Sequence, residues 1–161
     1  MPRYLRAGIR KDLWFSPEWL PAGAVPASAL GDLKAPDNEL SFYEVPDDTH
    51  IERIAVAFAA TRNKIDKVGY VVFDGAPLPG LGLNLVRSPG DTPDAVVNAL
   101  HYDLPQVTGH NLVDLAGVMI GGVRDDILPK RLGPLLQEGV DGGRLDKSKM
   151  KRSLLTEIAR L

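Results

Sequence analysis

Residues 39–75 read ELSFYEVPDDTHIERIAVAFAATRNKIDKVGYVVFDG, and this stretch decides the fold that the sequence predicts. Residues 40–45 alternate apolar side chains between two faces, which is typical of a strand. Pro46 ends that strand, and residues 47–49 then offer N-caps and negative charge for the start of a helix. Apolar side chains recur at three- and four-residue spacing after this point, so a helix with one buried stripe is expected.

The same stretch closes with a second strand over residues 68–73, where nearly every side chain is apolar. A short apolar run of this kind indicates a strand that is buried on both faces. The three elements form a β-α-β-like unit, whose length fits a right-handed parallel crossover. An antiparallel arrangement through a longer return fits the same pattern. A further short strand is expected over residues 4–9.

The remainder of the chain has a helical pattern from Thr92 onward. We expect four helical segments: a helix over residues 92–102, a helix opened by Thr108 or Asn111, a broken segment over residues 127–138, and a last helix capped by Asp146. The predicted fold class is therefore α+β. It has a small sheet with strands near residues 4–9, 40–45 and 68–73, and a helical C-terminal half.

Composition places the chain among ordinary soluble proteins. A length of 161 residues favours a single domain over residues 1–161. Hydrophobic residues make up 44% and charged residues 25%, and the net charge of −2 gives no general attraction to nucleic acid or acidic membranes. The absence of cysteine excludes disulfides, thiolate metal sites and a cysteine nucleophile. No apolar run is long enough to span a bilayer. We therefore expect a soluble, cytoplasmic protein, and the sequence leaves its oligomeric state open.

Asp74 is the best-placed carboxylate of the sequence, because it ends the buried strand at residues 68–73. Ligands and catalytic acids often lie at this position in open α/β sheets, although Asp74-Gly75 is also a common way to begin a turn. His101 and Asp103 could supply an imidazole and a second carboxylate for acid–base chemistry. No nucleophile motif, phosphate loop or metal-ligand spacing accompanies these residues. No catalytic set, metal site or cofactor is assigned, and a hydrolase would use Asp74, His101 and Asp103 together.

One candidate binding surface is aromatic. Trp14, Phe15 and Trp19 lie within six residues of one another, among prolines. Packed outward, they would resemble the aromatic hot spots of protein interfaces. Packed inward, they would cover a small core, and this arrangement is favoured.

A second candidate surface is basic. It consists of Arg144, Lys147, Lys151 and Arg152, on the expected C-terminal helix. Such a cluster could contact phosphates or an acidic protein partner. More often, such a cluster is the solvated face of an amphipathic helix whose other side packs on the core.

Three functions follow from these patterns. The leading hypothesis is a non-enzymatic, protein-binding accessory protein of bacterial type, such as an immunity or antitoxin-like protein or a subunit of a complex. It rests mainly on the lack of a catalytic motif, and it implies a protein partner. The first alternative is a small hydrolase with a site of Asp74, His101 and Asp103. The second is nucleic-acid binding through the basic C-terminal helix.

Overall fold

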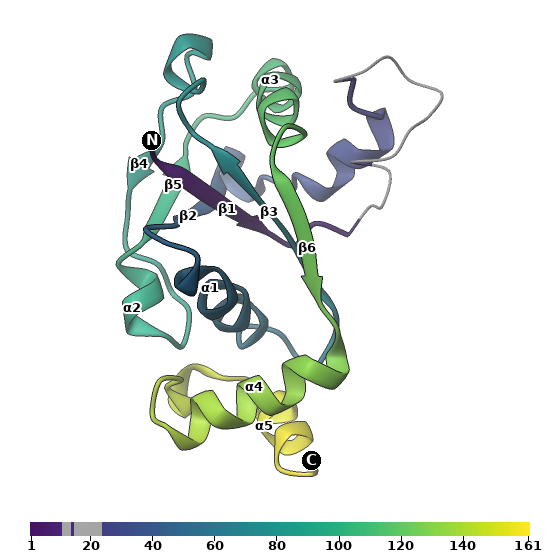
Figure 1. Cartoon of the computed structure of the whole chain (residues 1–161), viewed down its shortest axis with the longest axis vertical. Coiled ribbons are helices and arrows are strands. Elements are labelled where there is room, and N and C mark those ends of the chain that lie inside the picture. Colours follow the sequence, from purple (N-terminus) through teal and green to yellow (C-terminus); the bar gives the residue numbers. More distant parts are fainter. Residues whose placement is uncertain (11–13, 15–23) are drawn as a thin grey trace.

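The computed structural model describes residues 1–10, 14 and 24–161. Within this part of the chain, six strands form one sheet in the order β4-β5-β2-β1-β3-β6, and all neighbours are antiparallel (Figure 1). The strands are β1 (Arg3–Ala7), β2 (Leu40–Glu44), β3 (Val68–Asp74), β4 (Val86–Arg87), β5 (His101–Leu104) and β6 (Val123–Ile127). The α+β class is confirmed, and the three expected strands are β1, β2 and β3.

The helices occupy both faces of the sheet. They are α1 (Thr49–Ala59), α2 (Ala95–Asn98), α3 (Gly109–Met119), α4 (Pro129–Asp141) and α5 (Arg152–Ile158), with 3-10 turns η2 (Ala27–Asp32), η3 (Pro36–Asn38), η4 (Pro79–Leu81) and η5 (Lys147–Lys149). Helices α1, α4 and α5 pack on one face, whereas α3, η2 and Trp14 pack on the other (Figure 1). Side chains of β3 point alternately into the two cores, which explains its nearly continuous apolar sequence.

The β2-α1-β3 unit is a split β-α-β unit. Strand β1 pairs with β2 through Tyr4 and Glu44 and with β3 through Tyr4 and Phe73, and both pairings are antiparallel. Strands β2 and β3 therefore run in the same direction, but β1 lies between them. The expected parallel orientation is present, whereas direct pairing of the two strands is not. The segment that separates them is the N-terminus of the chain, which the 39–75 pattern does not contain.

The expected helix over residues 92–102 is wrong in its second half. Helix α2 ends at Asn98, and residues 101–104 form β5, which pairs with β2. The helix begins after Asp94, rather than at Thr92, because the Asp94 carboxylate accepts hydrogen bonds from the backbone N–H groups of Val96 and Val97. Cross-strand pairing with β2 therefore outweighs the helical spacing of the local sequence.

The C-terminal half also contains β6, which the sequence pattern did not predict. Its sequence, Val-Arg-Asp-Asp-Ile, lacks apolar alternation because it lies at the edge of the sheet, where charged side chains are common. Helix α4 continues through the exposed Pro134, so the expected break is absent. Asp146 caps the turn η5, and α5 begins only at Arg152. The predicted cap at Thr108 is confirmed, since Thr108 and Asn111 form a capping box.

Candidate functional site

His101 and Asp103 lie close together on β5, and they meet Ser88, which the sequence did not single out. The Ser88 hydroxyl lies 3.0 Å from His101 Nδ1 and donates to Asp103 Oδ2 at 2.5 Å. His101 Nε2 lies 3.6 Å from Asp103 Oδ1. Ser41 on β2 donates to Asp103 Oδ1 at 3.2 Å. These groups border an open cavity of about 490 Å³ to which His101, Asp103 and Ser41 contribute.

The hydrogen bonds define how the protons are held in this cluster. His101 Nδ1 lies 3.2 Å from the Ser88 carbonyl oxygen, which can only accept a hydrogen bond. Nδ1 donates to this oxygen in the tautomer that carries the ring proton on Nδ1. The Ser88 hydroxyl gives its single proton to Asp103. In a nucleophilic triad the serine hydroxyl donates to the imidazole, whereas here the Ser88 hydroxyl donates to Asp103. The arrangement therefore ties β5 to β2 and to the residue that follows β4, with the serine proton directed at Asp103.

Asp74 does not join His101 and Asp103. Strands β3 and β5 are separated by β1 and β2 in the sheet, so they lie about 14 Å apart at the usual strand spacing. Asp74 is exposed, and its carboxylate accepts a hydrogen bond from the N–H of Ala76 at 2.9 Å. It therefore begins the turn after β3, and the three-residue site of the hydrolase hypothesis is not assembled.

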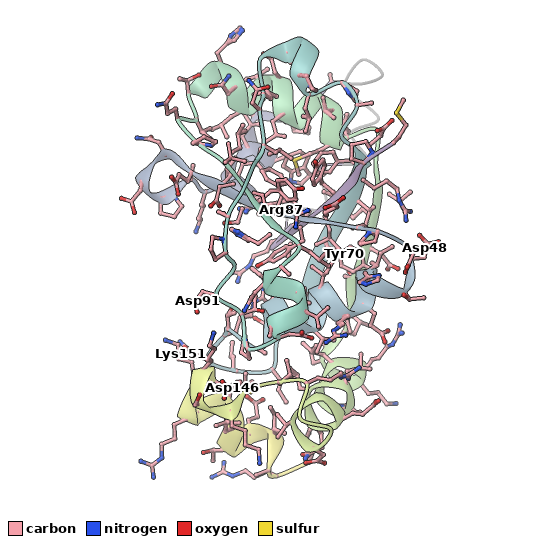
Figure 2. The ribbon with its side chains drawn as sticks, turned by 90° about the vertical axis from the view of Figure 1, so that its left-hand side faces the viewer. Asp48, Tyr70, Arg87, Asp91, Asp146 and Lys151 are labelled. Carbon is pink, nitrogen blue, oxygen red and sulfur yellow. The ribbon has the colours of Figure 1, made fainter. Side chains whose placement is uncertain are left out.

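Asp74 instead borders a groove at the N-terminal end of β1, where Arg3 lies. We call it the acidic groove. Its cavity measures about 510 Å³. Its apolar floor consists of Ile51, Tyr70 and Val72, with Val123 at its mouth, and its rim consists of Arg3, Asp48, Asp74 and Asp125. Phe73, Gly121 and Gly122 also contribute to its lining. Figure 2 shows Tyr70 and Asp48 on the same side of the molecule.

The acidic groove has a negative rim. Asp48, Asp74 and Asp125 outnumber Arg3, which pairs with Asp48 at 2.8 Å. Burial raises the pKa of Tyr70, and the negative charge of Asp125 raises it further. Val123 is 73% exposed at the mouth of the groove, on the outer strand of the sheet. An apolar floor with an exposed valine and acidic surroundings suits a ligand that is apolar and positively charged.

The aromatic candidate surface is only partly described. The Trp14 side chain is buried in the core beneath α3, and its Nε1 donates to Asp32 at 3.0 Å. Trp14 therefore packs inward and offers no surface to a partner. Phe15 and Trp19 lie outside the described residues.

The basic candidate surface does not lie on one helix. Arg144 follows α4, Lys147 lies in η5, and Lys151 and Arg152 stand at the start of α5. All four are exposed. Asp91, Asp146 and Lys151 lie in the same part of the molecule (Figure 2), where Lys149 approaches Asp91 at 3.6 Å. Acidic side chains are thus interspersed with the basic ones.

Two negative observations apply to the described ranges. No group of three or more histidine and carboxylate side chains is arranged there to hold a metal ion. No helix among the described residues has the length and apolarity needed to cross a membrane.

Comparison with protein-family models, with curated proteins and with solved structures gave no match to this chain.

Proposed function

We propose that the protein is a non-enzymatic accessory protein that binds a protein partner through the acidic groove. The partner would insert an apolar side chain between Tyr70 and Val123, with a lysine or arginine beside it. The observation that carries this proposal is the apolar floor ringed by Asp48, Asp74 and Asp125.

Charge complementarity selects the occupant. A lysine or arginine beside the inserted side chain would meet the carboxylates of the rim, whereas an acidic segment would be repelled. A second copy of this chain would bring the same acidic rim against itself. The cavity of about 510 Å³ is large enough for one or two side chains, which fits a short segment of a partner rather than a broad flat surface.

The proposal can be tested by selecting peptides from a random display library on the immobilised chain. Selected peptides should carry Lys or Arg next to an aliphatic or aromatic residue. Their affinity, measured by fluorescence anisotropy, should fall as salt is raised, because exposed charges are screened. The substitution Val123→Lys should weaken binding at least about tenfold, since it places a cation at the mouth of the groove.

Val113→Lys is the matched control, because Val113 is also an exposed valine, at 56%, but lies on α3 outside the groove. Peptides without a basic bias, or equal weakening by Val113→Lys and Val123→Lys, would refute the proposal. Self-association of the wild-type chain that is lost in Val123→Lys would identify a second copy as the occupant and would also refute it.

A hydrolase is the second candidate, because Ser88, His101 and Asp103 lie within hydrogen-bonding reach of one another beside a cavity. This function requires the Ser88 hydroxyl to turn from Asp103 to His101. A site of these three residues would replace the one that included Asp74. Hydrolysis of p-nitrophenyl esters or phosphates should then be lost in both Ser88→Ala and His101→Ala. A rate that is unchanged in both variants would remove this candidate.

A further inference from the structure

Four cationic side chains gather around a cleft at the C-terminal ends of β1 and α1. Arg6, Arg10, Lys34 and Arg62 line a cavity of about 500 Å³, in which Asp32 is the one acidic residue among the described lining. We call this the cation cleft. It lies at the opposite end of β1 from the acidic groove, which begins at Arg3. The net charge of −2 for the whole chain conceals this local concentration of positive charge.

Carboxylates compensate the four cations only in part: the charge of Asp32 acts to raise the pKa of Arg6, and that of Asp66 to raise the pKa of Arg62. None of the four forms an ion pair in the described part of the chain. Other arginines there do form ion pairs with carboxylates, namely Arg3, Arg53, Arg87 and Arg131. Arg6 donates instead to the backbone carbonyl of Ser41 at 2.8 Å, and Arg62 to that of Lys67 at 2.7 Å. The Asp32 carboxylate accepts from the backbone N–H of Arg10 and from Trp14.

Gathering these charges is electrostatically unfavourable without an anion. Burial lowers the pKa of Arg6 to about 10. Burial and then the charge of Arg10 lower the pKa of Arg62. The Nε atom of Arg6 is buried and has no hydrogen-bond partner in the described structure. An anion in the cleft would reduce the repulsion among the four cations and would supply the negative charge that they lack.

A second cavity continues from the cation cleft and has a different character. The two cavities share Arg6, Ala7, Lys34 and Phe58, and the second is the one bordered by His101 and Asp103. Apart from the shared Arg6 and Lys34 and from His101, its charged lining is acidic and consists of Glu39, Asp91 and Asp103. A ligand that extends into it must therefore carry its negative charge at one end only. Hydroxyl groups at the other end could donate to the carboxylates.

We propose that the cation cleft and the adjoining cavity bind a small organic phosphate. The phosphate groups would contact Arg6, Arg10, Lys34 and Arg62, and the hydroxylated remainder would lie beside Ser41 and Asp103. A single carboxylate would match only one of the four cations, whereas a diphosphate matches the charge of the cleft more closely. A continuous nucleic-acid backbone would have to pass the acidic lining of the adjoining cavity, so a small molecule fits better.

Calorimetric titration of the full chain with pyrophosphate and with ADP tests the proposal. Both should bind at a single site, and ADP should bind more tightly, because it also reaches the adjoining cavity. Arg10→Gln and Lys34→Gln should each weaken binding about tenfold, the usual effect of losing one charge-assisted contact. Neither side chain donates a hydrogen bond to a described residue, so both variants should fold, as circular dichroism would verify.

Arg152→Gln is the control, because Arg152 is exposed at the start of α5, outside the cleft. The proposal is overturned if neither pyrophosphate nor ADP saturates a site, or if Arg152→Gln weakens binding as much as Arg10→Gln. Binding of single-stranded DNA that exceeds ADP binding and falls in Arg10→Gln would overturn it in favour of a polyanion site.

Discussion

Replacing Asp94 with alanine should lower the free energy of unfolding by about 3 kcal/mol. The Asp94 side chain is nearly fully buried in front of α2. Its Oδ1 atom accepts from the N–H groups of Val96 at 2.9 Å and Val97 at 3.3 Å. Arg53 donates to both carboxylate oxygens, at 2.6 and 2.9 Å. This one side chain therefore caps α2 and joins it to α1.

The magnitude combines two contributions. Loss of an N-cap costs about 1 kcal/mol. Charge-assisted hydrogen bonds contribute about 1.5–3 kcal/mol, and we take about 2 kcal/mol because Arg53 is 30% exposed and regains water when its partner is removed. Asp94→Asn should cost about 2 kcal/mol, since the amide oxygen can still cap the helix while the ion pair is lost. For a chain of this length, 3 kcal/mol corresponds to a Tm lowered by about 6–12 °C.

Urea unfolding followed by circular dichroism measures these changes, and equal m-values would verify that the unfolding reaction is the same. Asp91→Ala is the control, because the Asp91 side chain is 98% exposed and contacts only Lys149 among the described ion pairs, so its effect should stay within about 0.5 kcal/mol. If Asp94→Ala is no more destabilising than Asp91→Ala, the reasoning about this cap and ion pair is wrong.

Two further predictions concern the sheet. Burial raises the pKa of Tyr43 to about 12, so an absorbance titration at alkaline pH should show a tyrosine that ionises near pH 12 and is missing from Tyr43→Phe. Because the folded pKa exceeds the ordinary value of 10.0, the stability linked to Tyr43 is present below pH 10 and lost as the pH rises toward 12; ionisation near pH 10 would contradict the burial argument. Gly69→Ala should cost at least about 3 kcal/mol in urea unfolding, since the added methyl group would overlap the carbonyl oxygen of Ile9. Gly31→Ala, where the new methyl group meets open space, should be nearly neutral, and an equal effect of both substitutions would refute the steric argument.

The candidate sites show which features a sequence pattern can reveal. His101 and Asp103 are two residues apart, so their proximity could be anticipated, but the expected helix would have placed them on different sides. Alternation along β5 instead puts both on the same face of the sheet. Ser88 reaches them because β4 pairs with β5, a contact that no local signal indicates.

The acidic groove likewise forms from segments that are distant in the sequence, so no local pattern predicts it. The sequence pattern points to Asp74 as a strand-end carboxylate, and Asp74 does lie on the rim of the groove, although not beside His101. Its neighbours there, Asp48 and Val123, come from the start of α1 and from the outer strand β6. The nearest sequence signal was the acidic run at residues 47–48, which predicted a helix start but not a surface.

The sequence by itself determined the elements whose signals are local. The apolar run of β3, the stripe of α1 and the capping pair of Thr108 and Asn111 act within a few residues, so their patterns are readable in the chain. Only the tertiary structure decided that β1 lies between β2 and β3. That insertion depends on hydrogen bonds between residues distant in the sequence. It also places the acidic groove at one end of β1 and the cation cleft at the other.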